Sequence, residues 1–454
     1  YGLAAAPNYG LAAAPDYGLA AAPDYGFAAA PFRVKPLGAA DTSCPRVYVY
    51  DVPELWDFPL ASLRDLATLP ADEVFGETCA KGRSLARKTN QYAMPLLVIW
   101  RLLRSTRCPR ALRPEDADLF LVPTYPNPKQ QPDWRRKCAG ERAALGPGGL
   151  ESKLPFLDAR TAHRHVFLLG KGHMSALPCE TWWSRPAGLL KRAVRVAYSP
   201  QFNATKDELR ERGVPAGPLG PFLYDDVDVS AAIASDPEAD DSAFPHLVTA
   251  PYASSFHRSV AETARPPWAD PLRPRPFRAV FYGNVASHET HPYARARGPA
   301  AAQCIDAPDC KVVDPTARNN ASALCGAEAA YGSATFCLQP GGDTPYRKGL
   351  YDALLMGCIP VVFGRHNAEV SPWFVPSGSM VVLSAADFVE GRARLMDRLR
   401  AIPKTEIWRM QTNIARGAHR LQYALDDVPG DAVETLLRGV VALAARREGR
   451  DAAA

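Results

Sequence analysis

Short apolar runs, each followed by a polar or turn residue, recur along the chain and predict β-strands. They cover residues 47–50, 117–125 and 165–173 in the first half and 278–284, 310–314, 335–338, 359–363 and 380–384 in the second half. Stretches with helical periodicity lie between the runs. Because strands that alternate with helices form parallel sheets, the pattern predicts α/β architecture in both halves.

The stretch "ATFCLQPGGDTPYRKGLYDALLMGCIPVVFG", residues 334–364, is the most informative part of the pattern. Two apolar runs enclose a Pro/Gly-rich turn and a helix, in which Leu350, Ala353 and Leu354 share one face. Gly357 suits the left-handed position just beyond the helix end. A crossover between parallel strands places the turn at the carboxyl end of the first strand, where open α/β sheets bind ligands. We therefore predict a binding site at this turn.

The start of this helix favours a negatively charged ligand. Its free N–H groups carry partial positive charge, and Arg347 and Lys348 add two cations, so a phosphate group fits best. Cations at a helix start are unfavourable by about 0.3–1 kcal/mol each, which a bound phosphate would compensate. The alternative is an ordinary surface ion pair between Lys348 and Asp352, which stand four residues apart.

The last apolar pattern, at residues 406–425, predicts an amphipathic helix. The chain starts with four copies of an eight-residue repeat, residues 1–32, whose regularly spaced prolines prevent a long helix and a core. This repeat is interpreted as a flexible spacer or, alternatively, as a structural wall-protein segment. A connector with five prolines, residues 263–278, predicts a domain boundary. We expect four parts: a low-complexity repeat and linker at 1–43, α/β domains at 44–265 and 266–425, and a helical tail at 426–454.

Composition narrows the possible partners. The net charge of +5 is small, and Lys and Arg occur singly or in pairs among acidic residues, which argues against nucleic acid. No apolar run approaches the roughly 20 residues of a membrane span. Because the first residue is Tyr1 and not Met, we expect that the native start is missing, and a signal or membrane anchor upstream stays open.

Ten cysteines without a CxxC pair favour disulfides in an oxidising compartment. Cys337 and Cys358 lie in apolar runs and are interpreted as small core hydrophobes. Sequons for glycosylation begin at Asn203 and Asn320. Together these features favour the secretory pathway.

Several segments together resemble the exostosin-type glycosyltransferases, glycosyltransferase family 47, and in particular the plant branch that contains xyloglucan galactosyltransferases. In chain order they are "RVYVYDVP", "ADLFLVPTY", "GKGH", "PHLVTAPY", "RAVFYGN" and the run at residues 331–363. The likeness spans about residues 44–425. It implies a GT-B fold, with two Rossmann-like domains whose parallel sheets face a cleft and a C-terminal helix that crosses back. It also implies an N-terminal acceptor domain, a C-terminal domain for a UDP-sugar, inversion of the anomeric centre and residence in the Golgi lumen.

The resemblance also implies roles for individual residues. Arg347 matches the phosphate-binding arginine of the family, and Asp352 matches an acidic residue that binds the ribose hydroxyls. The plant pattern commonly has two arginines at this place, so a phosphate contact from Lys348 would be less directional. The complete nucleotide-sugar set that we predict is Gly283, Gly341, Gly342, Tyr346, Arg347, Lys348 and Asp352. Arg295 and Arg297 stay open as further diphosphate ligands.

Inverting transfer requires a base for the acceptor hydroxyl. The catalytic candidates are Asp51 and His173, which follow predicted strands of the N-terminal domain. Helix N–H groups and Arg347 are expected to stabilise the leaving diphosphate, so we expect no metal cofactor. The triplet Asp226–Asp228 keeps a metal-dependent alternative open, because carboxylates in this spacing bind divalent cations in other sugar transferases.

Two other functions are alternatives to glycosyl transfer. Residues 169–175, "LGKGHMS", approximate the dinucleotide motif G-x-G-x-x-G of an oxidoreductase. Ser175 replaces its third glycine, and no acidic residue follows at the end of a second strand. A non-catalytic carbohydrate- or nucleotide-binding protein of the same fold is the other alternative, and it would not release UDP.

Overall fold

The computed structural model describes eleven segments of the chain, and their bounds are 44–52, 62–79, 86–123, 149–168, 188–198, 247–262, 264–285, 294–315, 325–342, 347–363 and 374–451. Several predictions fall outside these segments, namely those at His173, Tyr346, Asn203, Asn320, Cys138, Cys179, Asp226–Asp228 and the repeat of residues 1–32.

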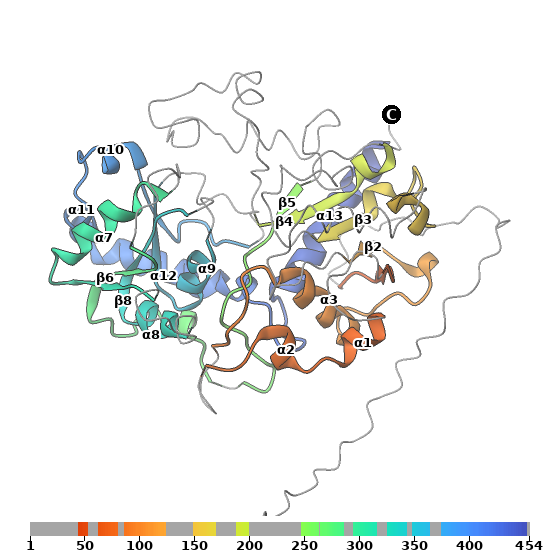
Figure 1. Cartoon of the computed structure of the whole chain (residues 1–454), viewed down its shortest axis with the longest axis horizontal. Helices are drawn as coiled ribbons and strands as arrows, with labels where there is room; N and C mark the ends of the chain where they lie inside the picture. The colour runs from red at the N-terminus through yellow and green to blue at the C-terminus, as the bar shows by residue number, and fades with distance from the viewer. Residues whose placement is uncertain are drawn as a thin grey trace, which may run out of the picture. The chain divides into compact units, whose positions relative to one another are not determined.

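Within the described residues, the first sheet contains five parallel strands, which pair in the order in which they follow one another along the chain (Figure 1). The strands are β1 (Val47–Val49), β2 (Leu119–Val122), β3 (His165–Leu168), β4 (Val194–Ala197) and β5 (Leu247–Thr249). Its helices are α1 (Leu63–Thr68), α2 (Ala71–Phe75) and α3 (Met94–Arg104), with 3-10 turns η2 (Pro114–Asp116), η3 (Leu150–Lys153), η4 (Ala162–Arg164) and η5 (Gly188–Arg192). Nine of the eleven residues of α3 are buried, and α1 and α2 pack against it. Burial of this apolar helix is therefore a main part of the core around the first sheet.

The second sheet also contains five parallel strands, but their order is β10-β9-β8-β6-β7. The strands are β6 (Phe277–Tyr282), β7 (Cys310–Val313), β8 (Ala334–Gln339), β9 (Ile359–Phe363) and β10 (Val381–Leu383). The helices of this half are α7 (Arg297–Ile305), α8 (Gly326–Gly332), α9 (Lys348–Leu355), α10 (Ala385–Val389), α11 (Leu395–Ala401), α12 (Lys404–Gly417) and α13 (Ala432–Asp451), with η6 (Pro267–Ala269) and η11 (Ala418–Leu421). After β7 the chain returns to the other side of β6 to form β8, so the strand order reverses at the β6–β8 pair.

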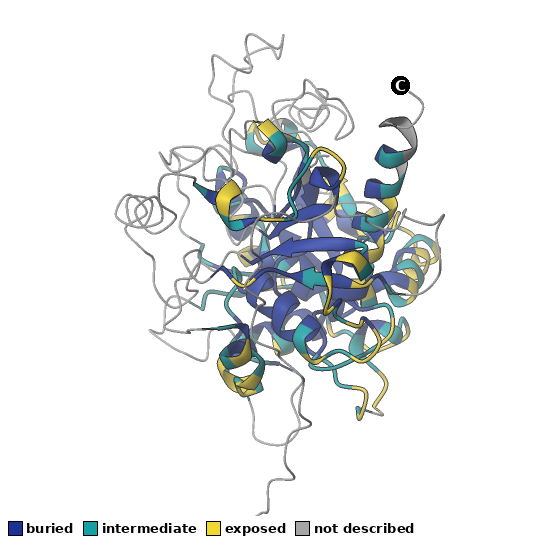
Figure 2. Ribbon diagram, turned by 90° about the vertical axis from the view of Figure 1, so that its right-hand side faces the viewer, coloured by how far each residue is buried: buried dark blue, intermediate teal, exposed yellow. Residues whose placement is uncertain are grey.

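The predicted α/β class with two parallel sheets is confirmed. All eight predicted strands are present, and β9 has its predicted bounds. Every residue of β2 and β9 is buried, as expected for strands covered on both faces, and the strands in Figure 2 are accordingly mostly dark blue. Gly357 has a φ of 67°, the left-handed conformation that was predicted beyond the end of α9.

The helix predicted for residues 406–425 is shorter than expected. It ends at Gly417 and is followed by η11, because later backbone groups bond to other segments. Leu425 N–H donates to the Arg258 carbonyl at 2.7 Å, and the Tyr423 carbonyl accepts a bond from His257. The following helix, α13, packs against η4 beside the first sheet, so the expected return of the C-terminal helix is confirmed (Figure 1).

Four disulfides occur among the described residues, and they are Cys44–Cys108, Cys79–Cys325, Cys304–Cys310 and Cys337–Cys358. The interpretation of Cys337 and Cys358 as simple core residues was wrong. Both are fully buried, but because β8 and β9 are neighbours their Cα atoms lie 5.9 Å apart, within bonding reach. Cys79–Cys325 joins the segment after α2 to the N-cap of α8.

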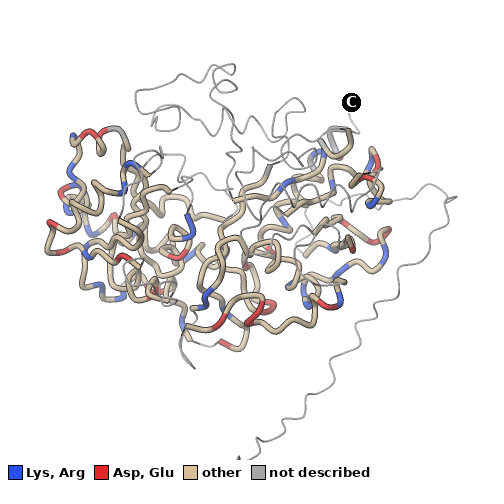
Figure 3. Tube along the Cα trace, viewed as in Figure 1, with Lys and Arg blue, Asp and Glu red and all other residues tan. Residues whose placement is uncertain are grey.

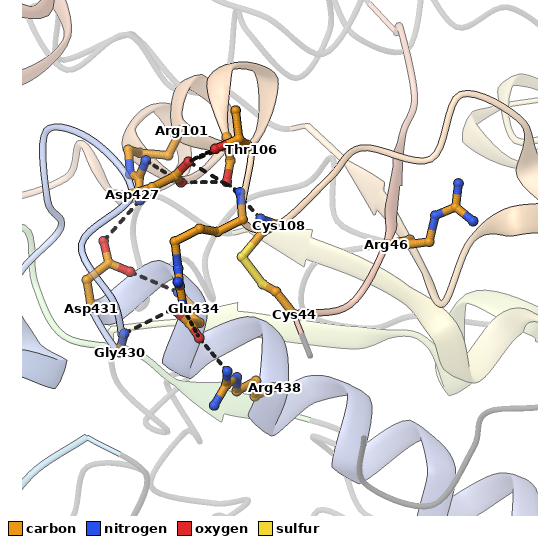
Figure 4. Close-up of a disulfide and its surroundings, with 12 residues drawn as sticks. Cys44, Arg46, Arg101, Thr106, Cys108, Asp427, Gly430, Asp431, Glu434 and Arg438 are labelled. Atoms are coloured by element: carbon orange, nitrogen blue, oxygen red, sulfur yellow. Dashed lines mark hydrogen bonds and ion pairs between the residues drawn. A yellow bond between two sulfur atoms is a disulfide. The ribbon is translucent and has the colours of Figure 1, made fainter. Parts of the chain in front are cut away.

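Asp427 joins the end of α3 to the segment before α13 (Figure 4). Its carboxylate accepts hydrogen bonds from Arg101 at 3.0 Å, from Ser105 at 2.6 Å and from the Thr106 N–H at 2.7 Å. Burial opposes ionisation of Asp427, but the bonds from Ser105 and Thr106 and the charge of Arg101 outweigh it and lower the pKa from 3.8 to about 2. Nearby, the Asp431 carboxylate accepts bonds from the N–H groups of Ala424 and Glu434. The charges of this cluster are thus paired within the chain.

Lys, Arg, Asp and Glu are interspersed along the described chain (Figure 3). Exposed pairs such as Arg400–Asp309 and Arg409–Glu406 are typical of it, and such pairs contribute little to stability. Among the described helices, none combines the length and the apolar character that a bilayer crossing requires.

Candidate functional site

The carboxyl ends of β6 and β8 meet in the middle of the second sheet. The two strands are paired in register, with Phe281 opposite Leu338, and they lead directly to Gly283 and to the turn Pro340–Gly342. Because the strand order reverses between them, the connections after β6 and β8 run to opposite sides of the sheet. This is the place where open α/β sheets bind ligands.

Arg347 lies between these two loops. It is the N-cap of α9, has extended backbone angles, and donates from Nη1 to the Pro340 carbonyl at 3.0 Å. Its guanidinium also lies against Gly283, since a Cβ atom placed there would be only 3.1 Å from Arg347 Nη2. Two residues of the predicted nucleotide-sugar set, Gly283 and Arg347, therefore lie side by side, and their contacts with a nucleotide stay predictions.

Arg297, the first residue of α7, contacts the same turn. It is buried and donates to the Gly341 carbonyl from Nη2 at 3.0 Å and from Nε at 3.3 Å. A Cβ atom on Gly342 would lie 3.0 Å from Arg297 Nη2 and 4.0 Å from Arg347 Nε. Two guanidinium groups thus flank the Gly341–Gly342 turn, and the sequence had left Arg297 as an open candidate.

Lys348 and Asp352 form hydrogen bonds with each other and with Ser255. Lys348 Nζ lies 2.8 Å from Asp352 Oδ2 and also donates to Ser255 Oγ, while the Ser255 N–H donates to Asp352 Oδ1 at 2.8 Å. Both charged residues are buried, with 8% and 3% of their surface exposed. The ion pair considered from the sequence is therefore present, but its expected place at the surface was wrong. Contacts of Lys348 with phosphate and of Asp352 with ribose stay predictions.

Ser255 is a residue that the sequence did not single out. It lies 97 positions before Asp352, in the segment after β5, and no local pattern marks it. Its contact with α9 could be found only from the tertiary structure.

Gly349 lets the first turn of α9 pack closely against its surroundings. A Cβ atom there would lie 2.7 Å from the Tyr331 hydroxyl and 2.8 Å from Gln339 Oε1. Tyr331 packs edge to face with Tyr282 at 5.5 Å between ring centroids. Burial, followed by the charge of Asp352, raises the pKa of Tyr282 to about 12, so this hydroxyl is neutral at physiological pH.

Of the two candidates for a catalytic base, Asp51 is the one that the structure describes. Asp51 is exposed and follows β1, at the carboxyl end of a strand as predicted. His173 lies outside the described residues. Two described histidines, His165 and His257, are buried and use both ring nitrogens in internal hydrogen bonds. Within the described segments, no three His, Cys, Asp or Glu side chains are grouped in a way that could hold a metal ion.

A profile of the Exostosin GT47 domain matches residues 42–384, which is most of the chain. The chain belongs to the exostosin GT47 family. Membership confirms the resemblance that was drawn from six segments between residues 46 and 363.

Curated relatives from Arabidopsis thaliana match shorter stretches. The probable xyloglucan galactosyltransferase GT19 is 37% identical over 94 residues, which is 20% of this chain and 22% of the relative. The xyloglucan galactosyltransferase XLT2 is 28% identical over 186 residues, 39% of this chain and 35% of the relative. The xyloglucan-specific galacturonosyltransferase 1 is 50% identical over 42 residues, 9% of this chain and 6% of the relative. The matched part of the chain thus spans well under half of each of these relatives.

Solved structures show a weaker likeness. The glycosyltransferase AviGT4, involved in avilamycin A biosynthesis, has 14% identity and a TM-score of 0.33, with 89% of this chain and 97% of that chain covered. The spinosyn rhamnosyltransferase SpnG, complexed with spinosyn aglycone, has 13% identity and a TM-score of 0.31, with 83% and 97% covered. Likeness at this level carries no argument about chemistry.

Proposed function

We propose that the protein is an inverting glycosyltransferase that moves a sugar from a UDP-sugar to a cell-wall or extracellular-matrix glycan or glycoprotein. The observation that carries the proposal is the meeting of Arg347 and Arg297 at the Gly341–Gly342 turn, at the start of α9 and at the strand reversal. Family membership supports the reaction class, and the geometry supports a diphosphate as the bound group.

The proposed chemistry uses charge stabilisation of the leaving group. As the bond between sugar and diphosphate breaks, negative charge grows on the diphosphate. N–H groups of the first turn of α9 and the guanidinium of Arg347 stabilise that charge, and Arg297 adds a second guanidinium. In this proposal a metal ion is dispensable, because cationic groups of the chain supply the charge.

The acceptor is proposed to bind at the first sheet. A base there removes the proton of the attacking hydroxyl, and Asp51 and His173 are the candidates for this role. Attack from the face opposite the diphosphate inverts the anomeric centre.

The proposals for the substrate class and for the compartment are based on the names of the relatives and on the disulfides, respectively. The relatives are named for galactosyl or galacturonosyl transfer to xyloglucan, so a UDP-hexose or UDP-hexuronic acid donor and a wall polysaccharide acceptor are proposed for this chain. The four described disulfides favour an oxidising compartment, in keeping with the Golgi lumen.

The test is incubation of the protein with a panel of UDP-sugars, with and without xyloglucan oligosaccharides, and measurement of released UDP. We expect release with one donor, persistence of release in EDTA, and loss of release in the Arg347→Ala variant. A protein that binds UDP but releases none from any donor would be the non-catalytic alternative. A strict metal requirement, or full activity of Arg347→Ala, would overturn the proposed chemistry.

A further inference from the structure

The buried contact between Ser255 and α9 links two segments that are distant in sequence. The contact consists of Ser255, Lys348 and Asp352, here called the Ser255 cluster. Asp352 accepts on both carboxylate oxygens, from the Ser255 N–H and from Lys348, and Lys348 also donates to the Ser255 hydroxyl. A buried ion pair with this many hydrogen bonds fixes the geometry of the groups that it joins.

The segment that carries Ser255 is itself held firmly. The Ser255 carbonyl accepts a bond from the Arg87 N–H at 2.7 Å, and Phe256 pairs with Ala86 as an antiparallel bridge. His257 adds bonds to Thr89 Oγ1 at 2.7 Å and to the Tyr423 carbonyl at 2.5 Å. The Ser255 cluster therefore attaches α9 to a well-anchored support.

A second connection reaches α9 from the same support. The Cys79 N–H donates to the Ala86 carbonyl at 2.9 Å, and Cys79 forms the disulfide with Cys325, the N-cap of α8. Helix α8 packs directly against α9. Two connections, one through Ser255 and one through α8, thus link Cys79 and residues 86–89 to this helix.

The first turn of α9 holds both Lys348 and, one residue earlier, Arg347. Because Lys348 follows Arg347 directly, the bonds of its side chain to Ser255 and Asp352 restrain the backbone that places the Arg347 guanidinium against Gly283. We propose that Lys348 and Asp352 are positioning residues, which with Ser255 hold the first turn of α9 and the Arg347 guanidinium in the binding geometry. The statement that this geometry is the one in which Arg347 binds a diphosphate rests on the proposed function.

Binding measurements with three probes separate a positioning role from a ribose contact. The probes are inorganic pyrophosphate, UDP and 2′,3′-dideoxy-UDP, titrated by calorimetry into the wild type and the Asp352→Asn variant. A positioning role predicts that Asp352→Asn weakens all three by a similar factor, about tenfold, because each probe uses the displaced Arg347. A ribose contact predicts that only UDP is weakened, and that result would overturn the inference.

The matched control is Glu406→Gln, which removes an exposed ion pair with Arg409 on α12, away from the turn. It should leave all three affinities unchanged. If the wild type binds neither pyrophosphate nor UDP, the proposed function fails, and hydrogen exchange then decides the positioning role alone.

Hydrogen exchange tests the attachment without a ligand. In Asp352→Asn, peptides covering 250–258 and 347–356 should both exchange faster than in Glu406→Gln, because the Ser255 cluster protects both segments. The double variant Lys348→Met/Asp352→Asn should unfold at a higher temperature than Asp352→Asn, since it leaves no buried cation unpaired. Unchanged exchange in both peptides would contradict the inference.

Discussion

The two sheets have the same number of parallel strands but a different strand order. The first sheet runs β1 to β5 in chain order, whereas the second runs β10-β9-β8-β6-β7 and reverses beside β6. An order that follows the chain sends successive connections the same way along the sheet, while a reversal makes the loops after β6 and β8 diverge. The reversal beside β6 is thus the kind of position where open α/β sheets bind ligands, and the described strands of the first sheet contain no such reversal.

Charged residues also serve different purposes in two regions. Around Asp427, the carboxylates are matched by hydrogen-bond donors of α3 and of the segment that follows it (Figure 4). At the reversal, Arg297 and Arg347 gather beside a glycine turn. The first arrangement stabilises the chain, and the second is suited to an anionic ligand. Substitutions in the two regions should therefore separate stability from binding.

The largest expected effect is on binding, from Arg347→Ala. Removing a guanidinium from a diphosphate site should weaken UDP binding by at least about 100-fold, close to 2.7 kcal/mol, as measured by calorimetry. Because the side chain lies at the start of α9 and not in the core, the unfolding temperature should change little. Unaltered UDP affinity, or a large fall in unfolding temperature, would remove the contrast between the regions.

A smaller effect, on stability alone, is expected from Asp427→Asn. The variant leaves Arg101 without its shortest ion pair and should lower the free energy of unfolding by about 2 kcal/mol at pH 7, with UDP affinity unchanged. The folded pKa of about 2 lies below the usual 3.8, so ionised Asp427 stabilises the fold above about pH 4. The stability difference between wild type and variant should therefore shrink as the pH falls from 4 to 2. Urea unfolding across this pH range measures it, and a constant difference would argue against the assigned role.

The sequence predicted the α/β class, eight of the described strands and the Arg347 turn, but not the strand order or the bonds of Asp427. Strand β9 was predicted at its observed bounds because a purely apolar run is closed by glycines on both sides. Strand β4 was missed because Arg195 interrupts its valines, and only the fold shows that this arginine is buried and bonded to the Leu190 carbonyl. Disulfide pairing and the contact of Ser255 with Asp352 depend on residues brought together by tertiary packing. Of the ten cysteines in the sequence, the eight in the described disulfides alone permit about 100 pairings.

The smallest expected effect comes from Gly283→Ala. Its Cβ would lie 3.1 Å from Arg347 Nη2, so the guanidinium must shift, and UDP affinity should fall by about tenfold. Gly391→Ala is the matched control, because Gly391 also has a positive φ, 76°, but a Cβ there meets no atom within 4 Å. The control should lose some stability through backbone strain and retain UDP affinity. Equal affinities in the two variants would mean that Gly283 has no part in the site.

The most direct measurement is a crystal structure of the protein soaked with UDP. The diphosphate is expected at the start of α9, within hydrogen-bonding distance of the Arg347 guanidinium and beside Gly341–Gly342. An unoccupied turn with UDP bound elsewhere, or a turn closed by neighbouring side chains, would contradict the account.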